Sequence, residues 1–195
     1  RERMDGILAY MFTMIREAHR CGRPLTRHQL TEAGRDIRLF PGVEGWFGRI
    51  NAFGASLGVT VEHYIISSGL KEILEGCSIG AEFKEIFASE FYYGEDGEAA
   101  WPKLAVNYTS KTQFVYRINK GVLDVSDDKT LNDSMPDDSK RVPFTNMIYL
   151  GDGLSDVPCM KMMQSYGGAS IAVYKEMGQS VKDLLERGRV DYIYP

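Results

Sequence analysis

The segment Gly151-Asp152-Gly153-Leu154-Ser155-Asp156 contains the residues best suited to chemistry in this chain of 195 residues. It follows an apolar stretch, Met147 to Leu150, that predicts a short strand. The glycines allow a sharp turn and a close approach of the backbone to a ligand. Asp152 and Asp156 supply two hard carboxylate groups near one point, which suits Mg²⁺. Asp156 could also simply cap the helix that Pro158 helps to start, and the two roles are compatible.

A second strand end carries hydroxyl groups. The apolar stretch Val59 to Ile66 predicts a buried strand that leads into Ser67-Ser68-Gly69, and helical spacing resumes at Leu70. A hydroxyl beside the free amides of a helix start can hold phosphate oxygens. An ordinary helix cap explains the same three residues equally well.

These two strand ends resemble the haloacid dehalogenase superfamily, and the likeness covers the chain from residue 41 onward. Family members carry a serine or threonine at one strand end, then a lysine, then an acidic loop often written Gly-Asp-Gly-x-x-Asp. The acidic loop, with Val157-Pro158-Cys159-Met160-Lys161 after it, is the specific part of the likeness. Ser67 and the lysine are specific only through their order along the chain.

Lys111 is the better match for the lysine of this resemblance. It stands at the start of a predicted helix that Thr109 or Ser110 can cap and that Gly121 ends. A solvent-exposed surface lysine is the alternative interpretation. Lys120 is the second candidate, but a lysine at a helix C-terminus usually interacts with the helix dipole.

The resemblance implies a Mg²⁺-dependent phosphatase acting on a small phosphorylated substrate through an aspartyl-phosphate. Asp152 would ligate Mg²⁺, and Asp156 would complete or orient that metal site. Ser67, with Ser68 and Gly69, would hydrogen-bond the phosphoryl oxygens. Lys111 would offset the negative charge beside the nucleophile.

The nucleophile of this resemblance is missing, because no Asp-x-Asp-x-Thr run follows a strand in these residues. The remaining aspartates of the middle of the chain lie in a polar stretch, 124–141, that predicts an exposed loop: Asp124, Asp127, Asp128, Asp137 and Asp138. We expect the nucleophile upstream, on a central strand between the strands 59–66 and 147–150. Unpaired buried backbone groups cost about 1–3 kcal/mol each, so these residues should not fold stably without that strand. Four side chains should converge at its carboxyl end: Ser67, Lys111, Asp152 and Asp156.

The remaining patterns predict the elements that position these residues. Residues 1–40 are expected to be helical and to form the trailing part of a small cap. Thr26 and Gln29 form a capping-box pattern, and Gly34 is placed to end that helix. Residues 41–195 alternate helices and strands. This predicts an α/β fold with a doubly wound, mostly parallel, Rossmann-like sheet covered on both faces. A β-hairpin is expected near 91–104.

Bulk composition narrows the class of protein. The net charge is −4, and the sequence lacks the stripe of basic residues that would indicate nucleic-acid binding. The longest apolar stretch, Ile7 to Ile15, is too short to span a membrane. Three cysteines without close-paired spacing indicate a reduced, cytoplasmic setting.

Two other functions are compatible with these residues. The phosphorylation domain of a cation pump carries a similar acidic loop, but the helical cap and the lack of a membrane segment disfavour it. A catalytically inactive relative, serving as a binding module or subunit, is supported by the missing nucleophile.

Overall fold

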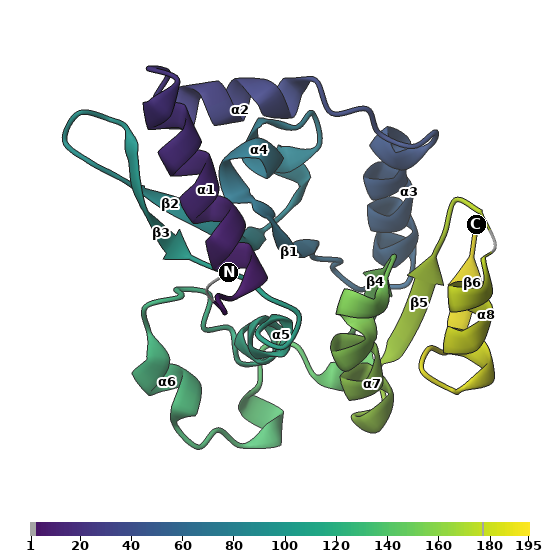
Figure 1. The fold of residues 1–195 in the computed structure, drawn as a ribbon. Helices are drawn as coiled ribbons and strands as arrows, with labels where there is room; N and C mark the ends of the chain where they lie inside the picture. Colours follow the sequence, from purple (N-terminus) through teal and green to yellow (C-terminus); the bar gives the residue numbers. More distant parts are fainter. Residues whose placement is uncertain (1–2, 177) are drawn as a thin grey trace. The chain divides into compact units, whose positions relative to one another are not determined.

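The structure is a computed structural model that describes residues 3–176 and 178–195. The chain forms two compact units (Figure 1). The first unit ends at Asn107, and the second runs from Tyr108 to Pro195. The boundary at residue 40 that the sequence suggests lies inside the first unit, and a cap role for residues 1–40 stays a prediction.

The first unit contains a three-stranded sheet with the order β1-β2-β3. Its strands are β1 (Tyr64–Leu70), β2 (Glu85–Tyr93) and β3 (Ala99–Leu104). β1 and β2 are parallel, whereas β2 and β3 form an antiparallel hairpin at the place where the sequence predicts one. Gly97 adopts a φ of 78° in the hairpin turn, a value that few side chains tolerate.

Two N-terminal helices begin at the caps that their sequences supply. In α1 (Gly6–Arg20), the Asp5 side chain accepts hydrogen bonds from the amides of Ile7 and Leu8. In α2 (Arg27–Arg35), Thr26 and Gln29 form both hydrogen bonds of the capping box, as predicted. A third helix, α3 (Val43–Ser56), comes after α2 along the chain.

Gly34 does not end α2, so that prediction was wrong. The residue is buried inside the helix, where α2 packs against the short helix α4 (Lys71–Gly76). A Cβ on Gly34 would lie 2.1 Å from the Ile73 carbonyl oxygen, and one on Gly76 would lie 1.9 Å from the Thr31 carbonyl oxygen. Because neither glycine has a side chain, the backbones of the two helices can approach each other closely.

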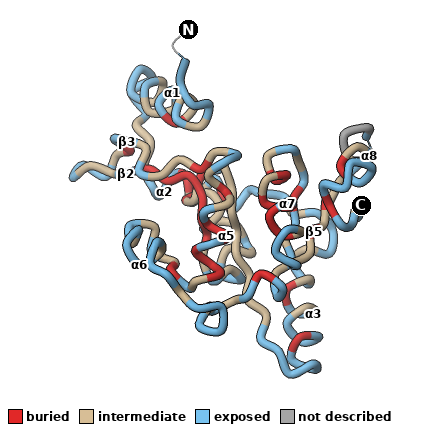
Figure 2. Tube along the Cα trace, turned by 90° about the horizontal axis from the view of Figure 1, so that it is seen from below, coloured by how far each residue is buried: buried red, intermediate tan, exposed pale blue. Residues whose placement is uncertain are grey.

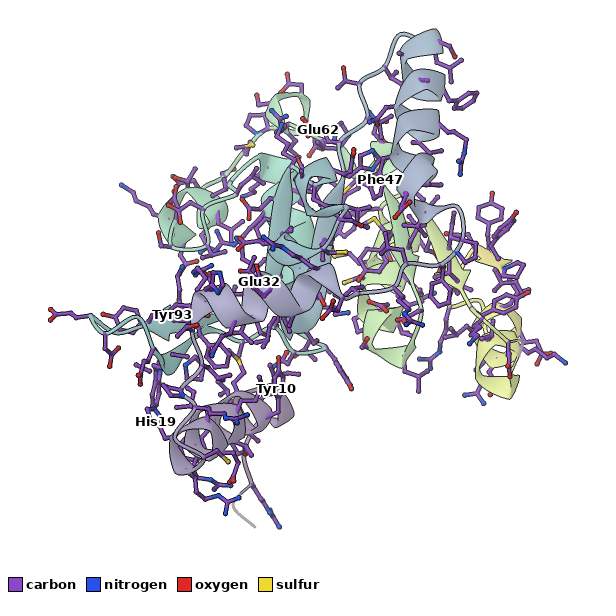
Figure 3. The ribbon with its side chains drawn as sticks, turned by 90° about the horizontal axis from the view of Figure 1, so that it is seen from above. Tyr10, His19, Glu32, Phe47, Glu62 and Tyr93 are labelled. Carbon is purple, nitrogen blue, oxygen red and sulfur yellow. The ribbon has the colours of Figure 1, made fainter. Side chains whose placement is uncertain are left out.

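Residues of α1 and α2 contribute directly to the core of the first unit. Its buried members come from helices and strands alike: Met11, Leu30, Leu70, Phe91 and Ala99. Tyr10, labelled in Figure 3, packs against this core and donates a hydrogen bond to the Ser68 carbonyl oxygen at 3.1 Å. The helical N-terminal segment is therefore part of the same packed unit as β1.

The second unit contains another three-stranded sheet, with the order β4-β5-β6 and all pairs parallel. Its strands are β4 (Ile148–Gly151), β5 (Ala169–Val173) and β6 (Tyr192–Tyr194). Its helices are α5 (Lys111–Lys120), α6 (Asp128–Asn132), α7 (Val157–Ser165) and α8 (Gln179–Glu186). The predicted helix at 111–120 is confirmed, including its end at Gly121, which adopts the left-handed conformation.

Helices α7 and α8 cover one face of this sheet, and Figure 2 shows the buried side of α7. The core on that face consists of Val157, Met160, Ala172, Leu184 and Val190. The other face carries exposed apolar side chains: Ile148, Leu150, Tyr192 and Tyr194. A mixed α/β fold with parallel strand pairs is thus confirmed, while within the second unit the described helices cover a single face.

The polar stretch 124–141 is more ordered than the sequence predicts. It contains α6 and a short 3-10 helix, Asp137–Ser139. The buried guanidinium of Arg117 donates hydrogen bonds to the carbonyl oxygens of Asp124 and Val125, at 2.7 Å and 3.1 Å. These hydrogen bonds from Arg117 of α5 hold the backbone of the stretch in place, which explains why it is more ordered than predicted.

No helix in the part of the chain that the structure describes combines the length and the apolar character needed to span a bilayer.

Candidate functional site

The second unit contains a buried ion pair between the two best site candidates. Lys111 Nζ lies 2.7 Å from Asp156 Oδ1, and the two side chains are 7% and 6% exposed. Nζ also donates to the Ser155 hydroxyl at 3.4 Å. Lys111 is the first residue of α5, whereas Asp156 ends a short 3-10 helix that follows β4. The interpretation of Lys111 as a solvent-exposed lysine is therefore wrong.

Asp156 is held by a second donor from the strand before the loop. The Tyr149 hydroxyl donates to the same oxygen, Asp156 Oδ1, at 2.8 Å. Although Asp156 occupies the N-cap position of α7, its side chain makes no capping hydrogen bond there. The plain helix-cap interpretation of Asp156 is thus wrong, and its carboxylate is committed to Lys111 and Tyr149.

Gly151 makes room for this carboxylate. A Cβ at Gly151 would lie 2.5 Å from Asp156 Cβ and 2.8 Å from Met160 Cε, closer than atoms can pack. A Cβ at Gly153 would meet nothing within 4 Å. Because Gly151 has no side chain, the Asp156 side chain can pack against the end of β4.

Asp152 follows β4 directly and is exposed, unlike Asp156. Within residues 3–176 and 178–195, no group of three or more His, Cys, Asp or Glu side chains is placed to hold a metal ion. The donor set nevertheless fits a hard cation. Asp152 is accessible, and the two hydrogen bonds that Asp156 accepts from described residues both use Oδ1, not Oδ2. Mg²⁺ usually keeps several waters, so one or two carboxylates can be the protein's share of such a site.

Burial sets the protonation of the groups around Asp156. It raises the pKa of the Tyr149 hydroxyl above its usual range, and the neighbouring Cys159 and Asp156 raise it further. Burial also raises the pKa of the Cys159 thiol to about 11, against a smaller lowering by Tyr149. Tyr149 therefore remains an O–H donor at neutral pH.

Ser67 lies in the first unit, so its convergence with the three other residues stays a prediction. β1 continues through Ser67 to Leu70, with an irregular register against β2 between those two residues. The Ser67 hydroxyl accepts a hydrogen bond from the Gly69 amide at 3.0 Å. The N-cap of α4 is Leu70, without a side-chain cap, so helix capping does not explain Ser67-Ser68-Gly69.

Ser68 differs from Ser67 in the surroundings of its hydroxyl group. Among the described residues, its hydroxyl oxygen is buried without a hydrogen-bond partner. Its carbonyl oxygen accepts hydrogen bonds from Tyr10 and from the Ser89 hydroxyl, at 3.1 Å and 3.2 Å. The backbone at Ser68 is thus fixed by α1 and β2, while its hydroxyl has no hydrogen-bond partner in the described part of the chain.

Lys120, the second lysine candidate, has a structural role. Its Nζ donates to the carbonyl oxygens of Leu131 and Asp133, at 2.6 Å and 2.7 Å. Those carbonyls lie at the end of α6, so Lys120 satisfies a helix terminus. Because Lys120 is committed to these carbonyl oxygens, Lys111 is the remaining candidate for the lysine of the site.

Sequence reasoning missed Tyr149 and Cys159. No local signal in the sequence identifies the tyrosine, because its role depends on which face of β4 is covered. In β4 the apolar Ile148 and Leu150 are exposed, so Tyr149 shares the covered face with Gly151. A buried phenol needs a hydrogen-bond partner, and the following acidic loop supplies the nearest acceptor.

Comparisons with known proteins add a relative but no function. No protein-family model matches the chain. It is similar to a protein of Borreliella burgdorferi that is described only as uncharacterized. The two are 27% identical over 203 residues, which covers 94% of this chain and 69% of that protein.

Proposed function

We propose that this chain supplies the acidic loop and the phosphoryl-binding residues of a Mg²⁺-dependent phosphohydrolase of the haloacid dehalogenase type. Its substrate would be a small phosphorylated molecule. The observation that carries the proposal is the buried pair of Lys111 Nζ and Asp156 Oδ1 at 2.7 Å, which joins residues 45 positions apart. Burying two charges is costly even when they are paired, so the retention of this pair beside an exposed Asp152 supports a functional role.

Each residue has a task that its surroundings support. Lys111 is fixed at the start of α5, where its ammonium can offset the charge of a phosphoryl group and of a nucleophilic carboxylate. Ser67 would donate its hydroxyl hydrogen to a phosphoryl oxygen, because its oxygen already accepts from Gly69. Ser68 and Gly69 would complete that subsite.

Asp152 would ligate Mg²⁺, and Asp156 would complete or orient the ligand set. The bound ion would supply Lewis-acid polarisation of a phosphoryl oxygen and charge neutralisation. The two carboxylates suit this ion because they are hard oxygen donors and because one of them is exposed.

The nucleophile has to come from an aspartate outside these residues. Its carboxylate oxygen would attack phosphorus and the substrate alcohol would leave, after which water would cleave the aspartyl-phosphate to phosphate and free carboxylate. Each of β1 and β4 pairs on a single side among the described residues, with β2 and β5 respectively. An unpaired strand edge can accept another strand, as the missing nucleophile strand of the resemblance would require.

A substrate panel tests this proposal on the complete natural protein. Phosphorylated metabolites are assayed for phosphate release with Mg²⁺ and with EDTA, and the acid-quenched protein is searched by mass spectrometry for an aspartyl-phosphate. We expect Mg²⁺-dependent release together with a phosphorylated aspartate. Release of no phosphate from any substrate, with no phosphorylated aspartate, would favour an inactive binding module instead.

A further inference from the structure

We infer that Tyr149 is a positioning residue of the proposed Mg²⁺ site: its hydroxyl holds Oδ1 of Asp156, so that Oδ2 is the oxygen left for the ion's ligand shell. The inference rests on the proposed function and adds a residue to it. Tyr149 would touch neither the ion nor the substrate, and it would act through Asp156.

The geometry around Asp156 supports this role. Lys111 Nζ and the Tyr149 hydroxyl approach one oxygen atom, Oδ1, at 2.7 Å and 2.8 Å. Two donors on the same oxygen fix the rotation of a carboxylate better than a single lysine can, because the lysine side chain has several rotatable bonds. Asp156 is 4% exposed, so solvent does not compete strongly for this oxygen.

The position of Tyr149 in β4 makes it the more rigid of the two donors. Its neighbours on the covered face, Gly151 and Ala172, pair with each other across β4 and β5. Tyr149 packs against the core formed under α7 and α8. A phenol fixed by packing has few alternative rotamers, and groups that hold a metal ligand in this way commonly tune metal affinity.

A purely structural role is the competing explanation, since a buried tyrosine often only satisfies a core acceptor. The two roles differ in what the substitution Tyr149→Phe changes. A positioning residue affects ion binding only while Asp156 is present to be positioned. A structural residue affects ion binding equally whether or not Asp156 keeps its carboxylate.

A double-mutant cycle on the complete natural protein separates these roles. Binding of Mg²⁺ alone is measured by isothermal titration calorimetry, without substrate, for the wild type and for Tyr149→Phe, Asp156→Asn and the double variant. We expect Tyr149→Phe to weaken Mg²⁺ binding about 10-fold. In the Asp156→Asn background the same change should weaken binding by less than about 2-fold. Tyr192→Phe, at a tyrosine 62% exposed in β6, is the matched control and should bind as the wild type does.

Folding is checked by thermal unfolding in EDTA. If Tyr149→Phe does not fold, Tyr149→Met replaces it, because that side chain also lacks the hydroxyl and fills the same apolar space. Unchanged Mg²⁺ binding by the folded variant, while Asp152→Asn loses binding, would overturn the inference and leave the proposed function standing. Equal losses in both backgrounds would likewise reject it. No Mg²⁺ binding by the wild type would overturn the proposed function and the inference together.

Discussion

Lys111 Nζ lies 2.7 Å from Oδ1 of Asp156, with both side chains less than a tenth exposed. This pair joins the start of α5 to the loop after β4. Removal of either partner would leave a buried charge without its counter-charge, so the pair affects both the stability of the second unit and the chemistry proposed for it.

Lys111→Ala should therefore destabilise the protein and reduce turnover together. Leaving Asp156 unpaired in a buried site costs about 3 kcal/mol. The turnover number kcat should fall far more than in Lys120→Ala, whose lysine satisfies carbonyl oxygens at the end of α6. Urea unfolding and steady-state kinetics measure the two effects. Equal, small losses of kcat in both variants would reject Lys111 as the charged group of the site.

Gly151→Ala should displace Asp156 from its two donors. The added methyl would lie 2.5 Å from Asp156 Cβ, so the loop or the side chain has to move. Forced overpacking of this kind costs about 1–3 kcal/mol.

Gly153→Ala is the matched control for this substitution. It adds the same methyl in open space on an extended backbone, and should change stability by less than about 0.5 kcal/mol. Urea unfolding of both variants checks the difference. Equal stability of the two variants would show that Asp156 does not lie against Gly151.

Gly76→Ala tests the packing of α2 against α4. The methyl would lie 1.9 Å from the Thr31 carbonyl oxygen, and backbone cannot move aside as a flexible side chain can. We expect a loss of about 3 kcal/mol in the free energy of unfolding. Gly48→Ala, at an exposed position of α3 with nothing within 4 Å, should instead stabilise the helix by about 0.5–1 kcal/mol. A tolerated Gly76→Ala would contradict the close approach of these helices.

The thiol of Cys159 should give an alkaline signature. Its pKa is raised from 9.0 to about 11 by burial, so folding favours the neutral thiol. Because the folded protein then holds the proton more tightly than the unfolded chain, this contribution is present below pH 9 and is lost as the pH rises through 11. The unfolding midpoint of the wild type should therefore fall more steeply over this range than that of Cys159→Ala. Parallel curves would contradict the shift.

Cysteine alkylation offers a simpler check on the same residue. At pH 8, iodoacetamide should modify the exposed Cys21 and leave the buried Cys159 unmodified until the protein is unfolded. Peptide mass spectrometry distinguishes the two sites. Rapid alkylation of Cys159 in the folded protein would show that its surroundings are open.

Local patterns in the sequence were enough to predict much of the fold. The capping box of Thr26 and the stop at Gly121 involve residues within one helical turn, so their hydrogen bonds follow from sequence alone. Gly34 was misinterpreted because its partner, Gly76, is distant in sequence. A glycine at a helix end and a glycine at a close helix crossing have the same local pattern.

The site shows the same limit. The acidic loop and Lys111 were identified from residue type and order, but their direct ion pair depends on packing between α5 and the loop after β4. Tyr149 was missed for a related reason. Its role depends on which face of β4 the helix α7 covers. The apolar residues on either side of it, Ile148 and Leu150, suggest that their own face is the buried one, but both are exposed.

The most direct test of the proposed Mg²⁺ site is Mg²⁺-dependent turnover of a phosphomonoester by the complete natural protein, compared between Asp152→Asn and Asp133→Asn. Both substitutions remove one exposed carboxylate from the second unit. We expect Asp152→Asn to lower kcat about 100-fold or more with the fold unchanged, since the ion's share of the barrier is several kcal/mol. Asp133→Asn should retain wild-type turnover. Full Mg²⁺-dependent activity in Asp152→Asn would show that Asp152 does not ligate the ion and would contradict the proposed function.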